Sequence, residues 1–281
     1  MLRDTRYKLL DGDVAAREVG DAATAHCSVV FLHGWLDNAA SFESVMVELH
    51  QLAPQLHLCA IDLPGHGLSS HKPASNYYPF HDYIDDVHQL LLNLSPNKLL
   101  LVGHSLGALI ASCYSAAFPE HVAGLIQIEA NGPLAESSEN SVKRLREGII
   151  SRRRIRTKPA REFTSLDDMI ARRASLNGLA ADQIAPVVFR GSEASQRGWH
   201  LRHDSKLKSD SLYRMSFAHA AQIRQHIRCP QVIIMGDQGY PGLQQDSHIS
   251  ADFVCIEGGH HCHLQQPMLT AQQIFALVNK I

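Results

Sequence analysis

The sequence lacks any apolar run long enough to cross a membrane, and it lacks an excess of basic residues. Spanning a bilayer takes about 18 consecutive apolar residues, more than any run in this chain of 281 residues provides. Its 26 Lys and Arg residues face 28 Asp and Glu residues, which excludes a protein that binds nucleic acid mainly through a basic surface. Because 45% of the residues are hydrophobic, we do not expect a disordered chain. The composition therefore favours a globular protein with neither a membrane span nor a nucleic-acid partner.

Paired cysteines and a leader-like start are also missing. The six cysteines are scattered without a Cys-x-x-Cys pair. Some of them, such as Cys59 and Cys255, lie in apolar runs, where a buried free thiol is typical. Residues 1–6 are not followed by the apolar segment of a secretory signal. We therefore expect free, buried thiols and a cytoplasmic location.

Short, continuous apolar runs alternate with helical or turn patterns along much of the chain. Continuous rather than alternating hydrophobicity is typical of parallel strands that are covered on both faces. The predicted strands are residues 28–32, 56–61, 99–102, 125–128, 232–235 and 253–256. Apolar residues at helical spacing occur in residues 84–94 and 271–281. This alternation predicts an α/β, doubly wound architecture.

The pattern changes between residues 132 and 228. The strand-like runs fade there, and Ser, Glu and Arg become frequent, including an arginine-rich run at residues 152–156. Apolar residues at helical spacing remain in part of the stretch. We therefore predict a core formed by residues 1–131 and 229–281, with 132–228 as a mostly helical insertion. The arginine run is interpreted as a solvated helix face, with binding of an acidic group as the alternative.

The segment Gly-His-Ser-Leu-Gly at residues 103–107 carries the strongest chemical signal. It follows a predicted strand and precedes a helical run of small residues, which is the context of a Gly-x-Ser-x-Gly elbow. In such an elbow the serine lies on a sharp strand-to-helix turn, and the helix N-terminus favours negative charge that develops nearby. Ser105 is therefore the candidate nucleophile. A Gly-Ser turn without catalytic meaning is the alternative.

A nucleophilic serine needs a base within hydrogen-bonding distance. His260 follows the last predicted strand, and its late position fits the serine, acid, histidine order of this class of elbow. His261 and His263 are neighbouring rivals. A metal site of these three histidines is the alternative, but adjacent residues point in different directions and no carboxylate is evident beside them. We expect His260 to be the base and no metal to be bound.

Two backbone N–H groups are candidates for stabilising an oxyanion. Trp35 lies just after the strand at residues 28–32, and Leu106 follows Ser105. Parallel strands bring both positions to the same edge of the sheet, where paired donors can hold developing negative charge. A simple strand-ending turn at Trp35 is the alternative.

Together these motifs resemble the α/β-hydrolase fold, in particular its capped serine hydrolase-like and epoxide-hydrolase-like members. The resemblance implies a mostly parallel, doubly wound sheet with a helical cap at residues 132–228. It also identifies His260 as the catalytic histidine, because in that family this residue precedes a proline by seven positions. The matching segments are His33-Gly34-Trp35, residues 62–67, residues 103–107, and Gly259-His260 with Pro267.

The chain departs from the family at the triad acid. The family usually places Asp three residues after the glycine that ends the penultimate strand, and Gly239 occupies that position here. Asp237 is nearby but two residues early. Glu129 ends the strand at residues 125–128, as does the acid of some haloalkane dehalogenases and coelenterazine luciferases. We favour Glu129 as the acid, with Asp237 as the alternative. A non-catalytic role for Glu129, in which its carboxylate caps the hinge at residues 131–133, is the other interpretation.

The identity of the nucleophile narrows the reaction. Related haloalkane dehalogenases and epoxide hydrolases use Asp at the elbow, so Ser105 argues against both activities. A serine implies acyl transfer from a small-molecule acyl substrate, with a carboxylic ester or thioester favoured and no cofactor needed. A C–C bond hydrolase of the same fold is one alternative. The other is a non-catalytic ligand-binding or interaction protein, which the missing acid at residue 239 supports.

Overall fold

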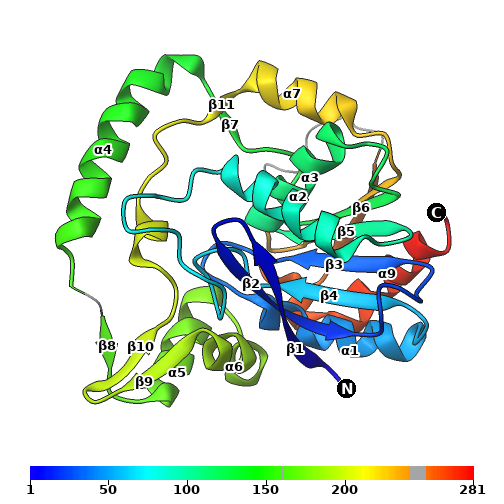
Figure 1. Ribbon diagram of the computed structural model, residues 1–281, viewed down its shortest axis with the longest axis horizontal. Helices are drawn as coiled ribbons and strands as arrows, with labels where there is room; N and C mark the ends of the chain where they lie inside the picture. The colour runs from blue at the N-terminus through cyan, green and yellow to red at the C-terminus, as the bar shows by residue number, and fades with distance from the viewer. Residues whose placement is uncertain (160, 241–250) are drawn as a thin grey trace.

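A central eight-stranded sheet organises the protein. The computed structural model describes residues 1–159, 161–240 and 251–281. Within them the sheet has the order β1-β2-β4-β3-β5-β6-β12-β13 (Figure 1). Its strands are β1 (Arg3–Leu9), β2 (Gly12–Val19), β3 (Ser28–Leu32), β4 (His57–Ile61), β5 (Leu99–His104), β6 (Gly124–Ile128), β12 (Gln231–Gly236) and β13 (Asp252–Ile256). The six strands from β4 to β13 run parallel, whereas β1 and β2 pair antiparallel with their neighbours. The predicted mostly parallel α/β sheet is confirmed.

Helices cover both faces of this sheet, which explains its continuous apolar strands. One face packs against α1 (Glu43–Leu52) and α9 (Pro267–Val278), and the other against α2 (Asp82–Leu94) and α3 (Leu106–Ala117). Within β3, Val29 and Phe31 belong to the first core, and Val30 and Leu32 belong to the second. Every residue of β3 is buried, because successive side chains point to opposite faces. The helices predicted in 84–94 and 271–281 are present, although α9 ends at Val278.

The edges of the sheet differ from the sequence-based expectation. Strands β1 and β2 were not predicted, because their alternation of exposed and buried positions lacks a long apolar run. At the other edge, β13 pairs on one side only among the described strands. Cys59 is buried as expected, but the prediction of a buried thiol is wrong for Cys255, which is exposed on this edge strand.

Between β6 and β12 the chain leaves the sheet. This stretch contains the helices α4 (Ser141–Thr157), α5 (Leu166–Asn177), α6 (Ala181–Arg190) and α7 (Phe217–His226). It also contains a small sheet of β8 (Glu162–Phe163), β10 (Gly198–Leu201) and β9 (Ser192–Ser195), and a pair of β7 (Ala135–Glu136) with β11 (Met215–Ser216). In Figure 1, α4 and α7 lie at the top and α5 and α6 at the bottom left. These short strands have little apolar content, so the sequence pattern did not reveal them.

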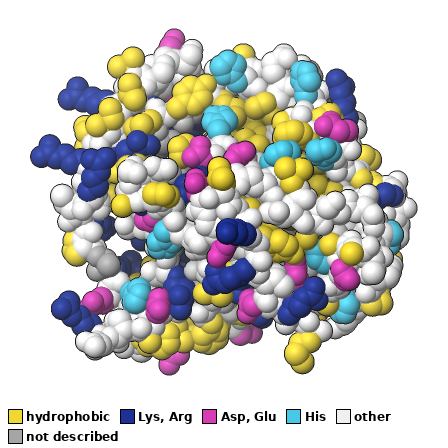
Figure 2. Space-filling model, in the orientation of Figure 1, with side chains coloured by type: hydrophobic (Ala, Val, Ile, Leu, Met, Phe, Trp, Pro, Cys, Tyr) yellow, Lys and Arg dark blue, Asp and Glu magenta, His cyan; other side chains and the backbone are white. Residues whose placement is uncertain are grey.

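The arginine-rich run lies in the last two turns of α4. Lys and Arg side chains gather on the side of the molecule where α4 lies (Figure 2). Two of the arginines contact the core rather than solvent alone. The Arg152 guanidinium stacks 4.0 Å from the centroid of the Tyr77 ring, and Arg156 Nε donates a hydrogen bond of 2.8 Å to the Tyr77 hydroxyl. The run therefore helps to hold α4 against residue 77.

Among the residues that the structure describes, none forms a helix that is both long and apolar enough to span a bilayer.

Glu18 joins the antiparallel edge to the parallel sheet. Its carboxylate accepts a hydrogen bond from the Tyr7 hydroxyl on β1 and lies 3.6 Å from His57 Nε2 on β4. Burial opposes ionisation of Glu18, but the contact with His57 and the hydrogen bond from Tyr7 outweigh it and lower the Glu18 pKa to about 2. The ionised carboxylate is therefore part of the folded edge.

Replacing Glu18 by Gln is expected to lower the free energy of unfolding at pH 7 by on the order of 2 kcal/mol. The folded-state pKa lies below the ordinary value of 4.5, so the carboxylate contributes fully above that pH and loses its contribution as the pH falls toward about 2. Urea unfolding of both proteins should show their difference shrinking as the pH falls. Exposed Glu120→Gln serves as the control, and a pH-independent difference would contradict this role of Glu18.

Candidate active site

Ser105 lies on a strained turn between β5 and α3. Its φ and ψ are 49° and −116°, a conformation that L-residues rarely adopt and that is typical of functional turns. The turn is fixed by the Ser105 N–H, which donates a hydrogen bond of 2.9 Å to the Ile128 carbonyl at the end of β6. A Cβ at Gly103 would come within 2.4 Å of Ala108, and one at Gly107 within 1.9 Å of the Leu32 carbonyl oxygen. Both glycines are therefore required by the close approach of the backbone.

The three predicted catalytic side chains come from the same end of the sheet. Ser105 follows β5, Glu129 follows β6 directly, and His260 lies in the loop after β13. The carboxyl ends of parallel strands meet at one edge, where ligands bind in open α/β sheets. Glu129 Oε2 lies 3.3 Å from His260 Nδ1. The carboxylate side chain is fully buried, whereas 27% of the His260 side chain is exposed.

Backbone N–H groups hold the Glu129 carboxylate in place. Oε1 accepts a hydrogen bond of 2.7 Å from Gly236 N at the end of β12, and Oε2 accepts one of 3.1 Å from Tyr240 N. These two hydrogen bonds orient the carboxylate so that Oε2 faces His260 Nδ1 as an acceptor. An Nδ1–H tautomer leaves the lone pair on Nε2, the nitrogen that a general base uses.

The absence of a side chain at position 239 leaves room for the Glu129 carboxylate. A Cβ at Gly239 would lie 2.0 Å from Glu129 Oε1. The Glu129 carboxylate thus occupies the space into which an acid at residue 239 would project. Asp237 lies elsewhere: it is exposed, and its Oδ1 accepts a hydrogen bond of 2.9 Å from Gly258 N. Glu129 also makes no capping contact with the hinge after β6 among the described hydrogen bonds.

The two predicted oxyanion donors lie beside the elbow. Leu106 is the first residue of α3, so its N–H has no partner within the helix. Trp35 lies in the turn after β3, which is closed by a hydrogen bond of 3.1 Å from Asp37 N to the Gly34 carbonyl. The Trp35 side chain is half exposed, and its indole Nε1 donates a hydrogen bond of 3.0 Å to the Leu207 carbonyl.

A buried polar network that sequence reasoning missed lies next to His260. His104 Nε2–H donates a hydrogen bond of 2.7 Å to the His260 carbonyl, and Asp37 Oδ2 accepts one of 3.2 Å from His261 Nε2. Asp37 Oδ1 also accepts a hydrogen bond of 2.5 Å from Arg173 on α5. The position of His104 inside the elbow motif was the available signal, but nothing in the sequence links residue 37 to residue 261.

The pKa values of this network follow from burial and charge. Burial opposes ionisation of Asp37, but His261 and Arg173 hold the pKa of its carboxyl well below the ordinary value. Burial and the neighbouring histidines keep the pKa of His104 well below its usual range. His104 is therefore neutral, which is consistent with an Nε2–H donor. His263 is fully buried behind it, where burial and His261 lower its pKa to about 3.

Asp37, His104 and His261 are the group in the described part of the chain that most resembles a metal site. One ligand atom from each lies within 4.8 Å of the others. The Asp37 charge is already balanced by Arg173, however, and its Oδ2 is bonded to His261. The donor set therefore fits a hydrogen-bonded network better than a metal centre.

The motif at residues 62–67 holds the loops around the site. The Asp62 carboxylate is fully buried and accepts hydrogen bonds from Ala39 N at 2.7 Å and from Leu68 N at 2.7 Å. Arg190, the last residue of α6, donates to it at 2.9 Å. A Cβ at Gly67 would come within 2.4 Å of this carboxylate. The motif thus anchors α6 to the sheet.

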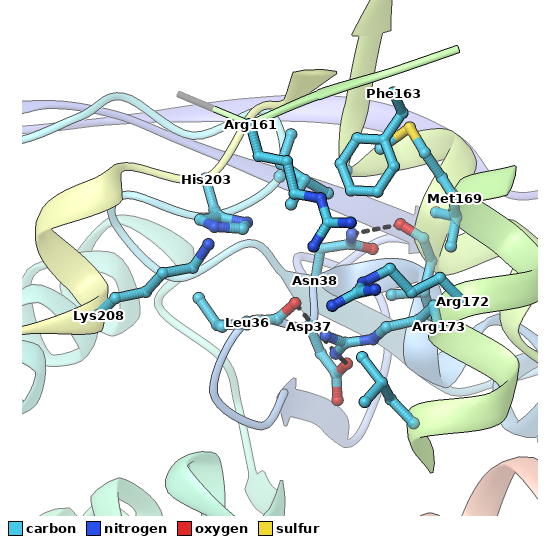
Figure 3. A pocket seen from close by; sticks show the side chains of 16 residues that line it. Leu36, Asp37, Asn38, Arg161, Phe163, Met169, Arg172, Arg173, His203 and Lys208 are labelled. Atoms are coloured by element: carbon cyan, nitrogen blue, oxygen red, sulfur yellow. Dashed lines mark hydrogen bonds and ion pairs between the residues drawn. The ribbon is translucent and has the colours of Figure 1, made fainter. Parts of the chain in front are cut away.

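A cavity of about 260 Å³ opens between residues 36–38 and the α5, α6 and β10 elements (Figure 3). Neither Ser105 nor His260 lines it. However, Leu36, the residue after Trp35, lines the cavity, and Asp37 in its wall accepts a hydrogen bond from His261. It therefore adjoins the candidate site without containing the reacting atoms.

Comparison with known proteins gives consistent matches. A family model described as alpha/beta hydrolase fold matches residues 28–238. The serine hydrolase-like protein of Danio rerio is 25% identical over 255 residues, covering 85% of this chain and 77% of that protein. Serine hydrolase-like protein 2 of Homo sapiens is 26% identical over 291 residues, covering 94% and 90%. The crystal structure of a Pseudomonas aeruginosa protein described as hypothetical is 26% identical, with a TM-score of 0.90 and 99% of each chain covered.

The tight elbow generates a stability prediction. Gly107→Ala is expected to lower the free energy of unfolding by about 3 kcal/mol or more, because the new Cβ would meet the Leu32 carbonyl at 1.9 Å. Gly178→Ala is the control: that residue has a φ of +64° but no atom within 4 Å of the added Cβ, so only the backbone conformation costs energy, about 1 kcal/mol. Equal losses in urea unfolding would contradict the packing argument.

Proposed function

Because this chain belongs to the α/β hydrolase fold family, we propose that it is a serine hydrolase that cleaves a small carboxylic ester or thioester. Ser105 is the nucleophile, His260 the general base and Glu129 the orienting acid. The observation that carries the proposal is the 3.3 Å contact between Glu129 Oε2 and His260 Nδ1, at the same sheet edge as the strained elbow of Ser105.

The proposed reaction begins at the Ser105 hydroxyl. Oγ attacks the carbonyl carbon of the ester while His260 Nε2 takes its proton. The N–H groups of Trp35 and Leu106 hold the oxygen of the tetrahedral intermediate, an interaction that can contribute roughly 3 kcal/mol per donor. The imidazolium then gives its proton to the departing alcohol or thiol, which leaves an acyl-enzyme. Water activated by His260 adds to the acyl carbon, and Ser105 regains its proton as the acid departs.

Glu129 supports the two protonation states that His260 needs. It accepts the Nδ1–H of the neutral ring, which selects the tautomer with a free Nε2, and its negative charge stabilises the imidazolium formed during each step. The Gly236 and Tyr240 N–H groups hold the carboxylate in this orientation. The carboxylate therefore acts as a fixed acceptor rather than as a proton carrier.

The same contact bears on the alternative functions. A non-catalytic binding protein drew its support from the missing acid at residue 239, and Glu129 beside His260 removes the need for that acid. A C–C bond hydrolase would use the same three side chains, but no described residue favours it over an esterase. We further propose that residues 132–228 form a cap over a core of residues 1–131 and 229–281, with the substrate between them.

A fluorophosphonate probe tests the nucleophile. We expect intact mass spectrometry to show one adduct per chain on wild type and none on Ser105→Ala, because the probe labels only an activated serine. Ser112→Ala, which removes another serine from the adjoining helix α3, should label normally. A folded wild-type protein that resists labelling, or label that persists in Ser105→Ala, would overturn the proposed function.

Three variants test the acid. We expect Glu129→Gln to lower kcat for a short-chain ester by on the order of 10³-fold to 10⁴-fold, the loss typical of removing a triad acid. Asp237→Asn should change kcat by less than about twofold, since its carboxylate bonds to Gly258 N. Gly239→Asp should be impaired, because its side chain would meet the Glu129 carboxylate.

A double variant makes this test sharper. Glu129→Gly tolerates the φ of 53° at that position and empties the space next to residue 239. Adding Gly239→Asp to it should restore activity relative to Glu129→Gly alone, because the new carboxylate reaches the same region. A full loss in Asp237→Asn with normal kcat in Glu129→Gln would assign the acid to residue 237 instead.

A further inference from the structure

The cavity beside the candidate site is dominated by positive charge. Arg161, Arg172, Arg173 and Lys208 line it, together with His203. Figure 3 shows these side chains arranged around the space in front of Asn38. Among the residues the structure describes, Arg161, Arg172 and Lys208 form no ion pair. The cavity therefore holds three basic side chains whose charge no acid in the described part of the chain balances.

The acidic residue in the wall does not change this balance. Among the described residues that line the cavity, Asp37 is the single carboxylate. Its Oδ1 accepts the hydrogen bond from Arg173, and its Oδ2 accepts the one from His261. Asp37 thus offsets Arg173 alone and leaves the other three cations uncompensated.

The basic groups lie close enough to repel one another. Burial lowers the pKa of the Lys208 ammonium, and the nearby charges of Lys158, Arg161 and Arg173 lower it further. Burial also lowers the pKa of His203 to about 3, with Lys208 adding to the effect, so His203 is neutral. A bound anion would relieve this repulsion, since opposite charges attract strongly in a partly buried site.

The remaining wall of the cavity is apolar. Phe163 and Met169 face the space (Figure 3), and Val187 also lines it. The Arg161 guanidinium stacks 4.9 Å from the Phe163 ring centroid. Apolar walls accept a hydrocarbon chain, while guanidinium groups bind planar anions such as carboxylates through paired hydrogen bonds. The volume of about 260 Å³ lies just below the ~300 Å³ at which small-ligand pockets usually begin. The complement of this cavity is a short hydrocarbon chain that ends in an anion.

We propose that this cavity binds an anionic group on the acyl chain of the substrate, so that the protein prefers esters or thioesters of short dicarboxylic acids or similar acyl anions. This inference rests on the proposed function and names its substrate class. The cavity wall starts at Leu36, next to the proposed oxyanion donor Trp35, while Ser105 lies outside the cavity. The anion is therefore held away from the scissile carbonyl, on the side where residues 132–228 meet the core.

Two esters of equal length test the preference. Monomethyl adipate and methyl hexanoate share the methyl ester and the four methylene groups, and they differ in a terminal carboxylate against a terminal methyl group. We expect kcat/KM to be at least about tenfold higher for monomethyl adipate, through a lower KM, the gain expected from one charge-assisted hydrogen bond. The preference should shrink in 0.5 M NaCl, because salt screens exposed charges.

Variants connect the preference to the cavity. Arg172→Gln and Lys208→Gln should each reduce the ratio of the two kcat/KM values severalfold, and the pair should abolish it. Arg146→Gln removes an exposed arginine of α4 that does not line the cavity, and it should keep the wild-type ratio. Arg173 is left intact because it pairs with Asp37.

A third ester separates the two sides of the scissile bond. In carboxymethyl hexanoate the carboxylate is on the alcohol, with ethyl hexanoate as its neutral match. Under our proposal this pair shows little preference. A stronger preference here than for the adipate pair would overturn the assignment of the cavity to the acyl chain.

Binding without turnover keeps the inference separate from the proposed mechanism. Titration calorimetry on Ser105→Ala should show monomethyl adipate binding at least about tenfold more tightly than methyl hexanoate, with the difference lost in Ser105→Ala/Arg172→Gln/Lys208→Gln. Fluorophosphonate labelling of wild type together with equal binding of both esters would overturn the substrate class alone. Tight, charge-dependent binding without labelling would overturn the proposed function and support the cavity as an anion site.

Discussion

The arrangement of the candidate site depends on one carboxylate that reaches across a strand. Glu129 begins at the end of β6, yet its partner His260 follows β13, and β12 lies between them. Neighbouring strands are about 4.8 Å apart, so the longer glutamate is needed where the family uses an aspartate after β12. The end of β12 makes this reach possible, because Gly236 N and Tyr240 N bind the carboxylate and Gly239 leaves room for it.

A second network joins this site to the part of the chain that lies outside the sheet. Asp37 is bonded to His261, next to the proposed base, and to Arg173 on α5, in the wall of the basic cavity. The Asp62 carboxylate similarly fixes α6 through Arg190. Both contacts use a buried acid from the core and an arginine from residues 132–228. Helices α5 and α6 are thereby held to the sheet loops by ion pairs as well as by apolar contacts.

The predictable parts of the molecule were those governed by local patterns. Runs such as residues 28–32 are apolar at every position because both faces of the sheet are covered, and the glycines of 103–107 are required by a single tight turn. The pairing of Glu129 with His260 was favoured from position along the chain, but its geometry depends on the end of β12. Edge strands β1 and β2, the contact of Asp37 with His261 and the gathering of Arg161, Arg172 and Lys208 arise from packing between distant segments, which periodicity does not encode. Cys255 was misjudged because a strand's place in the sheet order, not its own residues, decides whether it is an edge.

The shared space at residues 129 and 239 also limits how such a site can change over evolutionary time. An aspartate at 239 would meet the carboxylate of Glu129, and loss of Glu129 would leave His260 without its acceptor. On the proposed mechanism, a lineage that moves the acid from one strand to the other therefore passes through a form in which the two acids collide or neither is present. Each single-step intermediate therefore has lower activity than either arrangement. Relatives should therefore carry one arrangement or the other, and exchanges between them should involve both positions together.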